Sequence, residues 1–158
     1  MNLVLCLDSH DPEFSLALGK AIGKRLEAGD VVALWGELGA GKTLLTRGIA
    51  IGLGIPEETP ITSPTFTIIN EYEGRLHLYH IDCYRIGDPE EMETLPWREA
   101  LFGPSVAVVE WPERLGTLLP ETRIDIFLEI LGPTSRRLRL VFRTDNLKGR
   151  FADLLNFV

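Results

Sequence analysis

The sequence predicts an α/β fold in which helices cover a sheet of mixed parallel and antiparallel strands. Two short apolar runs, Val31 to Trp35 and Ser105 to Val109, are typical of strands that are covered on both faces. Two alternating runs, Arg123 to Leu131 and Arg136 to Arg143, lie on either side of a Gly-Pro-Thr-Ser turn and indicate an antiparallel hairpin. Buried strands combined with such a hairpin favour a layered α/β sandwich.

A strand followed by a helix is expected at the N-terminus. Leu3 to Leu7 has the length and apolarity of a buried strand, and Asp11 and Pro12 then provide an N-cap and a proline at the first helical position. Apolar residues recur at helical spacing after this start, and Gly29 is placed to end the helix in the left-handed conformation. These apolar residues are Phe14, Leu18, Ile22 and Leu26.

The middle of the chain predicts a second helix, a loop and a second hairpin. The helix runs from Gly41 to about Leu53, where a glycine and a proline interrupt the pattern, and Pro56 to Pro64 is expected to be a polar loop. Thr65 to Tyr72 and Leu76 to Asp82 flank Glu73-Gly74, so we expect them to pair as a hairpin.

Two further helical segments complete the expected domain. Helical propensity resumes between Asp88 and Phe102, before the second buried strand. Near the C-terminus, apolar residues at helical spacing predict a helix that packs on the last hairpin. Residues 1–158 fit a single domain, because domains most often contain about 100 to 150 residues. The C-terminal apolar residues are Leu147, Phe151, Leu154 and Val158.

The composition narrows the classes of function. A net charge of −7 argues against holding nucleic acid by bulk electrostatics, and Arg137, Arg139 and Arg143 are interpreted as a solvated stripe on an outer strand face. No apolar run approaches the roughly 20 residues that a membrane helix needs and the N-terminus lacks the regions of a signal peptide, so we expect a cytoplasmic protein without membrane contact. Cys6 and Cys83 lie far apart with no CxxC, which favours reduced, partly buried thiols over a metal or redox site.

The segment Gly36 to Thr43, GELGAGKT, matches the phosphate-binding pattern GxxxxGK[ST] completely. It lies between an expected buried strand and an expected helix, which is the context that this loop requires. Its glycines let backbone N–H groups approach phosphate oxygens closely. Lys42 would contact the β and γ phosphates, and the hydroxyl of Thr43 would ligate Mg²⁺. We therefore expect a P-loop NTPase-like three-layer sandwich around the mixed sheet.

Two carboxylates that follow strands are the candidate catalytic residues. Glu110 ends the second buried strand and Asp82 ends the middle hairpin, so each could hold the metal, directly or through water, or orient the attacking water. The sequence leaves this division of roles open. For His80, a hydrogen-bonded structural role is favoured over a transition-metal site, because no further His or Cys stands at ligand spacing. The candidate metal ligands are Thr43, Glu110 and Asp82.

Ser63-Pro64-Thr65 follows the polar loop and offers two hydroxyls that could respond to a γ-phosphate, as nucleotide-sensing loops do. The tryptophans Trp35, Trp97 and Trp111 are expected to serve core or interface packing rather than to stack on a base. The candidate ATP-binding residues are Gly36, Glu37, Leu38, Gly39, Ala40, Gly41, Lys42, Thr43 and Thr65.

Four motifs occur in order along the chain: LWGELGAGKT at Leu34 to Thr43, SPTF at Ser63 to Phe66, HIDCYR at His80 to Arg85, and VVEWPER at Val108 to Arg114. With these motifs the chain resembles, over nearly its whole length, the TsaE (YjeE-like) family, the bacterial ATPases of tRNA threonylcarbamoyladenosine biosynthesis. A general metabolite kinase is not expected to show this combination.

The resemblance implies a P-loop fold that binds ATP and Mg²⁺ and hydrolyses ATP slowly. It also implies TsaD and TsaB as partner proteins, which transfer the threonylcarbamoyl group of an adenylate made by TsaC to adenosine 37 of tRNA. Contact with tRNA would then be indirect, through that complex. The residues implied by motif are Lys42 and Thr43 for phosphate and magnesium, Asp82 and Glu110 as functional carboxylates, and Ser63 to Phe66 as a switch-like loop.

The chain departs from the family at two positions, and two other functions compete with the one implied. The family usually has Asp where Glu37 stands and Leu where Cys83 stands, and the longer Glu37 side chain could alter how the loop is braced.

A small-molecule kinase would use the same loop but needs an acceptor pocket and usually a cationic lid. A nucleotide-sensing module would bind ATP without hydrolysing it. A GTPase is disfavoured because the sequence has no NKxD-like guanine reader, which leaves ATP as the expected nucleotide.

Overall fold

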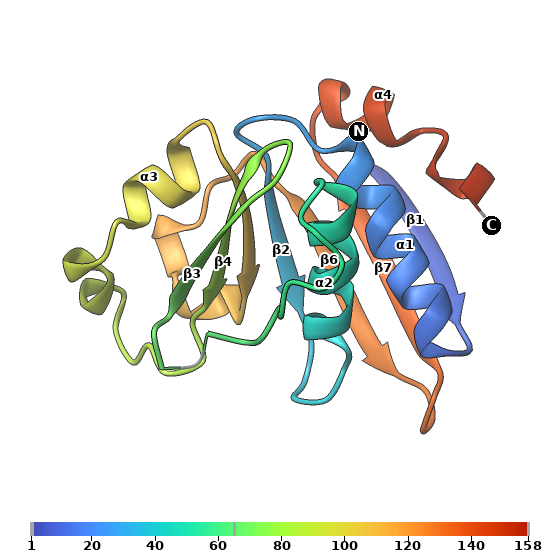
Figure 1. The fold of residues 1–158 in the computed structure, drawn as a ribbon, viewed down its shortest axis with the longest axis horizontal. Helices are drawn as coiled ribbons and strands as arrows, with labels where there is room; N and C mark the ends of the chain where they lie inside the picture. Colours follow the sequence, from blue (N-terminus) through green and yellow to red (C-terminus); the bar gives the residue numbers. More distant parts are fainter. Residues whose placement is uncertain (1, 65, 158) are drawn as a thin grey trace.

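The computed structural model describes residues 2–64 and 66–157, and within them seven strands form one mixed sheet (Figure 1). The strands are β1 (Leu3–Ser9), β2 (Val31–Trp35), β3 (Ile69–Glu73), β4 (His77–Asp82), β5 (Val106–Glu110), β6 (Ile124–Ile130) and β7 (Arg136–Phe142). Their order in the sheet is β1-β7-β6-β2-β5-β4-β3. β2 is parallel to β5 and β6, and β4 is parallel to β5, whereas the outer pairs and β6–β7 are antiparallel. The expected mixed sheet is confirmed.

Helices cover both faces of this sheet, which makes three layers. The α-helices are α1 (Pro12–Arg25), α2 (Lys42–Gly52), α3 (Trp97–Phe102) and α4 (Asp145–Phe151), and the 3₁₀ helices are η1 (Pro89–Thr94), η2 (Pro112–Arg114), η3 (Gly116–Leu118) and η4 (Leu154–Phe157). One buried cluster joins α1, α2 and α4 to one face, and a second joins α3 to the other. Side chains of β2 alternate between the two clusters, with Val32 and Leu34 in the first and Val31 and Ala33 in the second. None of the helices in the described part of the chain has the length and apolarity to span a bilayer.

The start of α1 is the one predicted, but its end is not. Asp11 accepts a hydrogen bond from the backbone N–H of Phe14 at 2.8 Å, and Pro12 occupies the first turn. The helix ends at Arg25 because Leu26 adopts an extended conformation and is almost fully buried. Gly29 has a positive φ of 90°, as expected of it, but it lies in the turn before β2, so its expected role at the helix end was wrong.

Strand β1 is an edge strand with only one covered face, so the prediction of a buried strand was wrong. Its only partner in the described sheet is β7, and Leu5 and Leu7 are buried while Val4 and Cys6 are exposed. The thiol of Cys6 is therefore accessible, contrary to expectation. Cys83 is fully buried, and burial raises the pKa of its thiol to about 12.

The segment from Asp88 to Phe102 forms two short helices where one helical segment was expected. Asp88 caps η1 by accepting from the backbone N–H of Glu90 at 3.0 Å. Leu95 is extended and precedes Pro96, which has no N–H to continue a helix. The proline therefore separates η1 from α3.

The middle hairpin is confirmed, with a shorter first strand than predicted. β3 begins at Ile69, and residues 66–68 form a turn in which Ile68 has a positive φ of 67°. Thr65 lies outside the described residues. At the other end of the chain, the predicted C-terminal helix is present as α4 and η4, and Val158 likewise lies outside the described residues. Its apolar residues Leu147, Phe151 and Leu154 are buried, as expected.

Helices α1 and α2 touch through their backbones at a glycine contact that the sequence analysis did not identify. Gly19 and Gly23 of α1 face Gly48 and Gly52 of α2, and a Cβ atom added to any of them would come within 2.7 Å of a carbonyl oxygen of the opposite helix. Small residues four apart on both helices permit this approach. The contact determines the position of α2, which starts at Lys42. Lys42 belongs to the segment Gly36 to Thr43, which we call the phosphate loop.

Candidate functional site

The phosphate loop joins the central strand β2 to α2. Gly39 and Gly41 have positive φ values of 83° and 101°, a conformation that side-chain-bearing residues rarely adopt. Gly36 is required for a different reason, because a Cβ there would lie 2.9 Å from the carbonyl oxygen of Leu128 on β6. The strand–loop–helix arrangement predicted for this segment is confirmed.

Arg136 of β7 braces this loop from behind, a role that the sequence analysis did not assign to it. Its guanidinium donates to the carbonyl oxygens of Ala40 at 3.0 Å and Gly39 at 3.1 Å, and also to those of Gly132 and Ser135. In a trans peptide the C=O and N–H point in opposite directions, so the N–H of Gly41 points away from Arg136. The contact spans 96 positions along the chain to Ala40, and no local pattern could have indicated it.

Lys42 is held inside the loop. Its Nζ donates to the carbonyl oxygen of Gly36 at 2.7 Å and lies 3.7 Å from the ring centroid of Trp111. The residue is only 5% exposed. Burial lowers the pKa of the ammonium, and nearby carboxylates, of which Glu110 acts most strongly, oppose part of that shift. The ammonium thus lies beside a ring face and one carbonyl oxygen, close to the candidate carboxylates.

The two candidate carboxylates are neighbours at the same edge of the sheet. Asp82 ends β4 and Glu110 ends β5, and the parallel register pairs them directly. Both are buried, with 4% and 3% of their surface exposed. One Oδ of Asp82 accepts from the backbone N–H of Tyr84 at 2.9 Å. The sequence prediction that both carboxylates stand at strand ends near the phosphate loop is confirmed.

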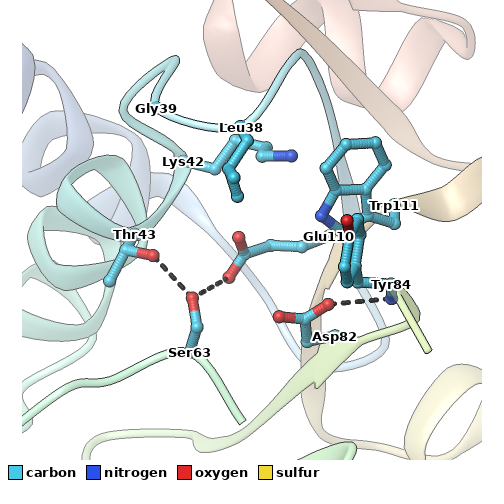
Figure 2. Close-up of a pocket in the computed structure, with 9 residues that line it drawn as sticks. All are labelled: Leu38, Gly39, Lys42, Thr43, Ser63, Asp82, Tyr84, Glu110 and Trp111. Carbon is cyan, nitrogen blue, oxygen red and sulfur yellow. Dashed lines mark hydrogen bonds between the residues drawn. The ribbon is translucent and has the colours of Figure 1, made fainter. Parts of the chain in front are cut away.

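A chain of hydrogen bonds links Glu110 to the phosphate loop (Figure 2). The hydroxyls of Thr43 and Ser63 are 2.7 Å apart, and Ser63 donates to Oε2 of Glu110 at 3.3 Å. Oε2 of Glu110 also lies 2.5 Å from Nε2 of His80. His80 is therefore hydrogen-bonded and buried, as the sequence analysis favoured. Ser63 brings the SPTF loop into contact with both the phosphate loop and the β5 carboxylate.

These residues enclose a cavity of about 220 Å³. Small-molecule pockets are usually about 300 to 1,000 Å³, so this cavity is smaller than a pocket that encloses a whole small-molecule ligand. Figure 2 shows the side chains converging on it from the loop, from β4 and from β5. The lining residues are Leu38, Gly39, Lys42, Thr43, Ser63, Asp82, Tyr84, Glu110 and Trp111.

Other predicted loop residues lie around the cavity without lining it. Glu37 is exposed, and its backbone carbonyl accepts from the N–H of Ala40, which is buried behind the loop. The cavity also contains Tyr84, which was not among the candidate residues. Tyr84 stands two positions after Asp82, so the alternation of β4 was the available signal, and its ring lies 4.9 Å from that of Trp111.

The donor set suits magnesium. Thr43, Ser63, Asp82 and Glu110 offer oxygen atoms at one place, and Mg²⁺ prefers oxygen ligands, typically one or two carboxylates completed by phosphate and water. Among the described residues no group of three or more His, Cys, Asp or Glu side chains could form a self-sufficient metal site.

The three arginines of the predicted stripe, two in β7 and Arg143 directly after it, all have partners within the protein. Arg137 forms an ion pair with Asp8, and the guanidinium of Arg139 lies 4.5 Å from the ring centroid of Phe127. Arg143 forms an ion pair with the buried Asp125 at 2.7 Å. All three residues nevertheless remain exposed, as expected of a solvated stripe.

The chain is similar to proteins of known family. The model described as "Threonylcarbamoyl adenosine biosynthesis protein TsaE" matches residues 9–138. The tRNA threonylcarbamoyladenosine biosynthesis protein TsaE of Treponema pallidum is 46% identical over 120 residues, which cover 76% of this chain and 87% of that protein. The Bacillus subtilis protein of the same name is 43% identical over 81% of this chain and 79% of its own length. The crystal structure of Bacillus subtilis YdiB matches with a TM-score of 0.81 at 34% identity, covering 99% of this chain and 97% of that one.

Proposed function

Because this chain belongs to the TsaE family of threonylcarbamoyladenosine biosynthesis, we propose that it is the accessory ATPase of that tRNA modification. It binds ATP with Mg²⁺, hydrolyses ATP slowly, and supports repeated threonylcarbamoyl transfer to adenosine 37 of tRNA by the TsaD and TsaB proteins. It works in the cytoplasm and meets tRNA through that complex. The observation that carries the proposal is one cavity that combines a complete phosphate loop with two buried strand-end carboxylates.

Lys42 is the residue that responds most directly to the phosphates. On ATP binding its Nζ exchanges the neutral carbonyl oxygen of Gly36 for charged phosphate oxygens, and charge-assisted hydrogen bonds are roughly twice as strong as neutral ones. The negative phosphates also favour the ammonium form, against the burial that lowers its pKa. Backbone N–H groups of the loop and the N-terminus of α2 provide the remaining contacts.

Thr43, Glu110 and Asp82 would hold Mg²⁺ together with the phosphates, directly or through water. The ion would supply neutralisation of the charge that develops on the phosphate oxygens. The chain's own contribution to hydrolysis is the orientation of the attacking water by the carboxylate pair, with Glu110 favoured because its hydrogen bonds already fix it beside Ser63. Ser63 would couple the SPTF loop to nucleotide occupancy because it contacts the hydroxyl of Thr43.

The cavity supports this proposal over a small-molecule kinase. Phosphoryl transfer to an acceptor usually needs further cations that close over the transferred group. Among the described residues that line the cavity, Lys42 is the one cationic side chain. The two buried carboxylates argue in turn against a module that only senses ATP, because such a module has no use for a water-orienting group.

The test is steady-state ATP hydrolysis by the purified chain, alone and with its cognate TsaD and TsaB, with Lys42→Ala as the blank. Stimulation of hydrolysis by the partner proteins is the expected result. Phosphorylation of a metabolite without any partner effect would establish the kinase alternative instead. Binding of ATP with no turnover under either condition would leave the sensing module.

Single substitutions of the carboxylates separate binding from chemistry. Glu110→Ala and Asp82→Ala are each expected to lower kcat by about 100-fold or more, as the loss of a positioned acid–base group does, while ATP affinity falls much less. The dissociation constant is measured with a fluorescent ADP analogue. Full turnover in either variant would remove that carboxylate from the mechanism.

A further inference from the structure

His80 is a buried polar side chain with only one of its two ring nitrogens in use. The residue is 0% exposed, Nε2 lies 2.5 Å from Oε2 of Glu110, and Nδ1 is the one buried side-chain nitrogen or oxygen of the described residues without a hydrogen-bond partner. Buried polar groups are nearly always satisfied, so each exception calls for an explanation. A leucine would fill the same place without burying an unpaired nitrogen, so packing alone does not explain a histidine at this position.

The geometry of β4 and β5 aims this ring at the carboxylate. The parallel register places His80 opposite Val108 and Asp82 opposite Glu110, so His80 stands one side-chain step before Asp82 on the same face. From there Nε2 reaches Glu110 across the strands. Donation from the ring to this carboxylate oxygen requires a hydrogen on Nε2 of His80.

The contact fixes the rotation of the Glu110 carboxylate. Oε2 is hydrogen-bonded to both His80 and Ser63, whereas within the described part of the chain Oε1 makes no hydrogen bond. With one oxygen held in this way, the other is presented to the cavity in a constant orientation. A carboxylate without this restraint would sample other rotations, and displacement of a reacting group by about 1 Å can cost 100-fold in rate.

We propose that His80 is a positioning residue that holds the Glu110 carboxylate in the orientation used for ATP hydrolysis. The proposal rests on the ATPase function proposed above and deepens it, because it assigns a residue that acts on Glu110 and not on the nucleotide. His80 contacts neither phosphate nor metal in this role. ATP affinity should therefore depend on it little, and turnover should depend on it strongly.

Two substitutions of His80 test whether a hydrogen-bond donor is needed at the position of Nε2 or of Nδ1. The amide nitrogen of glutamine stands at about the distance of Nε2 from the backbone, and the amide nitrogen of asparagine at about that of Nδ1. His80→Asn is expected to lower kcat roughly 10- to 100-fold with the KM for ATP changed less than about threefold. His80→Gln is expected to retain most of the wild-type kcat. His77→Asn is the matched control, since His77 lies on the opposite face of the same strand and pairs with Glu71 and Glu73 at the surface.

A readout without turnover tests the hydrogen bond itself. In the nucleotide-free protein, ¹H–¹⁵N NMR of the histidine rings should show a slowly exchanging Nε2–H signal that is absent from His80→Gln and moves in Glu110→Gln. A hydrogen on Nδ1 of His80, or a signal that ignores Glu110→Gln, would overturn the proposal at the level of structure.

The kinetic outcomes separate this proposal from the one on which it rests. If wild-type protein hydrolyses ATP with its partners but His80→Asn is as active as wild type, or His80→Gln is as impaired as His80→Asn, the positioning role is overturned and the ATPase function stands. If wild-type protein hydrolyses no ATP, the ATPase function fails and the positioning role fails with it. Loss of kcat in the asparagine variant together with rescue by glutamine supports both.

Discussion

The close contact between α1 and α2 lets us predict how much Gly48→Ala changes the free energy of unfolding. Replacing glycine by alanine in a helix interior normally stabilises a protein by about 1 kcal/mol. At Gly48, however, the new Cβ would lie 2.4 Å from the carbonyl oxygen of Leu16 and 2.9 Å from the Cα of Gly19. Ordinary van der Waals contact begins at 3.4 Å, so the helices would have to separate locally by about 1 Å.

The expected net effect of Gly48→Ala is destabilisation. Overpacking of a tight contact costs typically about 1 to 3 kcal/mol. The upper part of that range applies because backbone atoms, and not a flexible side chain, must yield. After the gain in helix propensity, the free energy of unfolding should fall by about 2 kcal/mol. A domain of this size loses about 2 to 4 °C in Tm per kcal/mol, so Tm should fall by about 4 to 8 °C.

The matched control is Gly149→Ala. Gly149 lies in α4, it is exposed, and a Cβ added there would meet nothing within 4 Å. Only the propensity effect applies, so Tm should rise by about 2 to 4 °C. Thermal unfolding followed by circular dichroism measures both variants. An unchanged or higher Tm for Gly48→Ala, or an equal loss in Gly149→Ala, would refute the reasoning.

Three further predictions concern the site and the thiols. Arg136→Gln should raise the dissociation constant for a fluorescent ADP analogue about tenfold, because the carbonyl oxygens that orient the phosphate loop lose their donor. The control Arg137→Gln should leave this dissociation constant unchanged. Equal dissociation constants for the two variants would contradict the bracing role of Arg136. ATP should change tryptophan fluorescence, because its phosphates would attract the Lys42 ammonium away from the ring of Trp111. Trp111→Phe should abolish that change. A fluorescence change that persists in this variant would show that another tryptophan is responsible. The pKa of Cys83 is raised to about 12, so its thiol stays protonated throughout the pH range 7 to 9. A thiol reagent should therefore label Cys6 alone in the native protein over that range. Rapid labelling of both cysteines would show that Cys83 is not buried.

Much of the site could be predicted because each part of it depends on neighbours in sequence. The glycines at positions 39 and 41 occupy backbone conformations that other residues rarely adopt, and the lysine and threonine follow them at fixed spacing. Asp82 and Glu110 could be placed at one edge of the sheet because parallel strands bring their carboxyl ends together. The failures at Gly29 and at the edge strand β1 share a cause. Local propensity marks where a turn or a strand is favourable, whereas a helix end or a covered face is decided by what packs against it.

The sequence by itself determined the phosphate loop, the strand-end carboxylates and the mixed α/β architecture, because φ preferences, residue alternation and apolar runs act over a few neighbouring positions. Only the tertiary structure decided that Arg136 braces the loop, that His80 binds Glu110, and that glycines of α1 and α2 meet. Each of these contacts joins residues about 30 to 100 positions apart through single atoms. Such contacts depend on the register of strands and the separation of helices, which are set when the whole core packs and not by any segment alone.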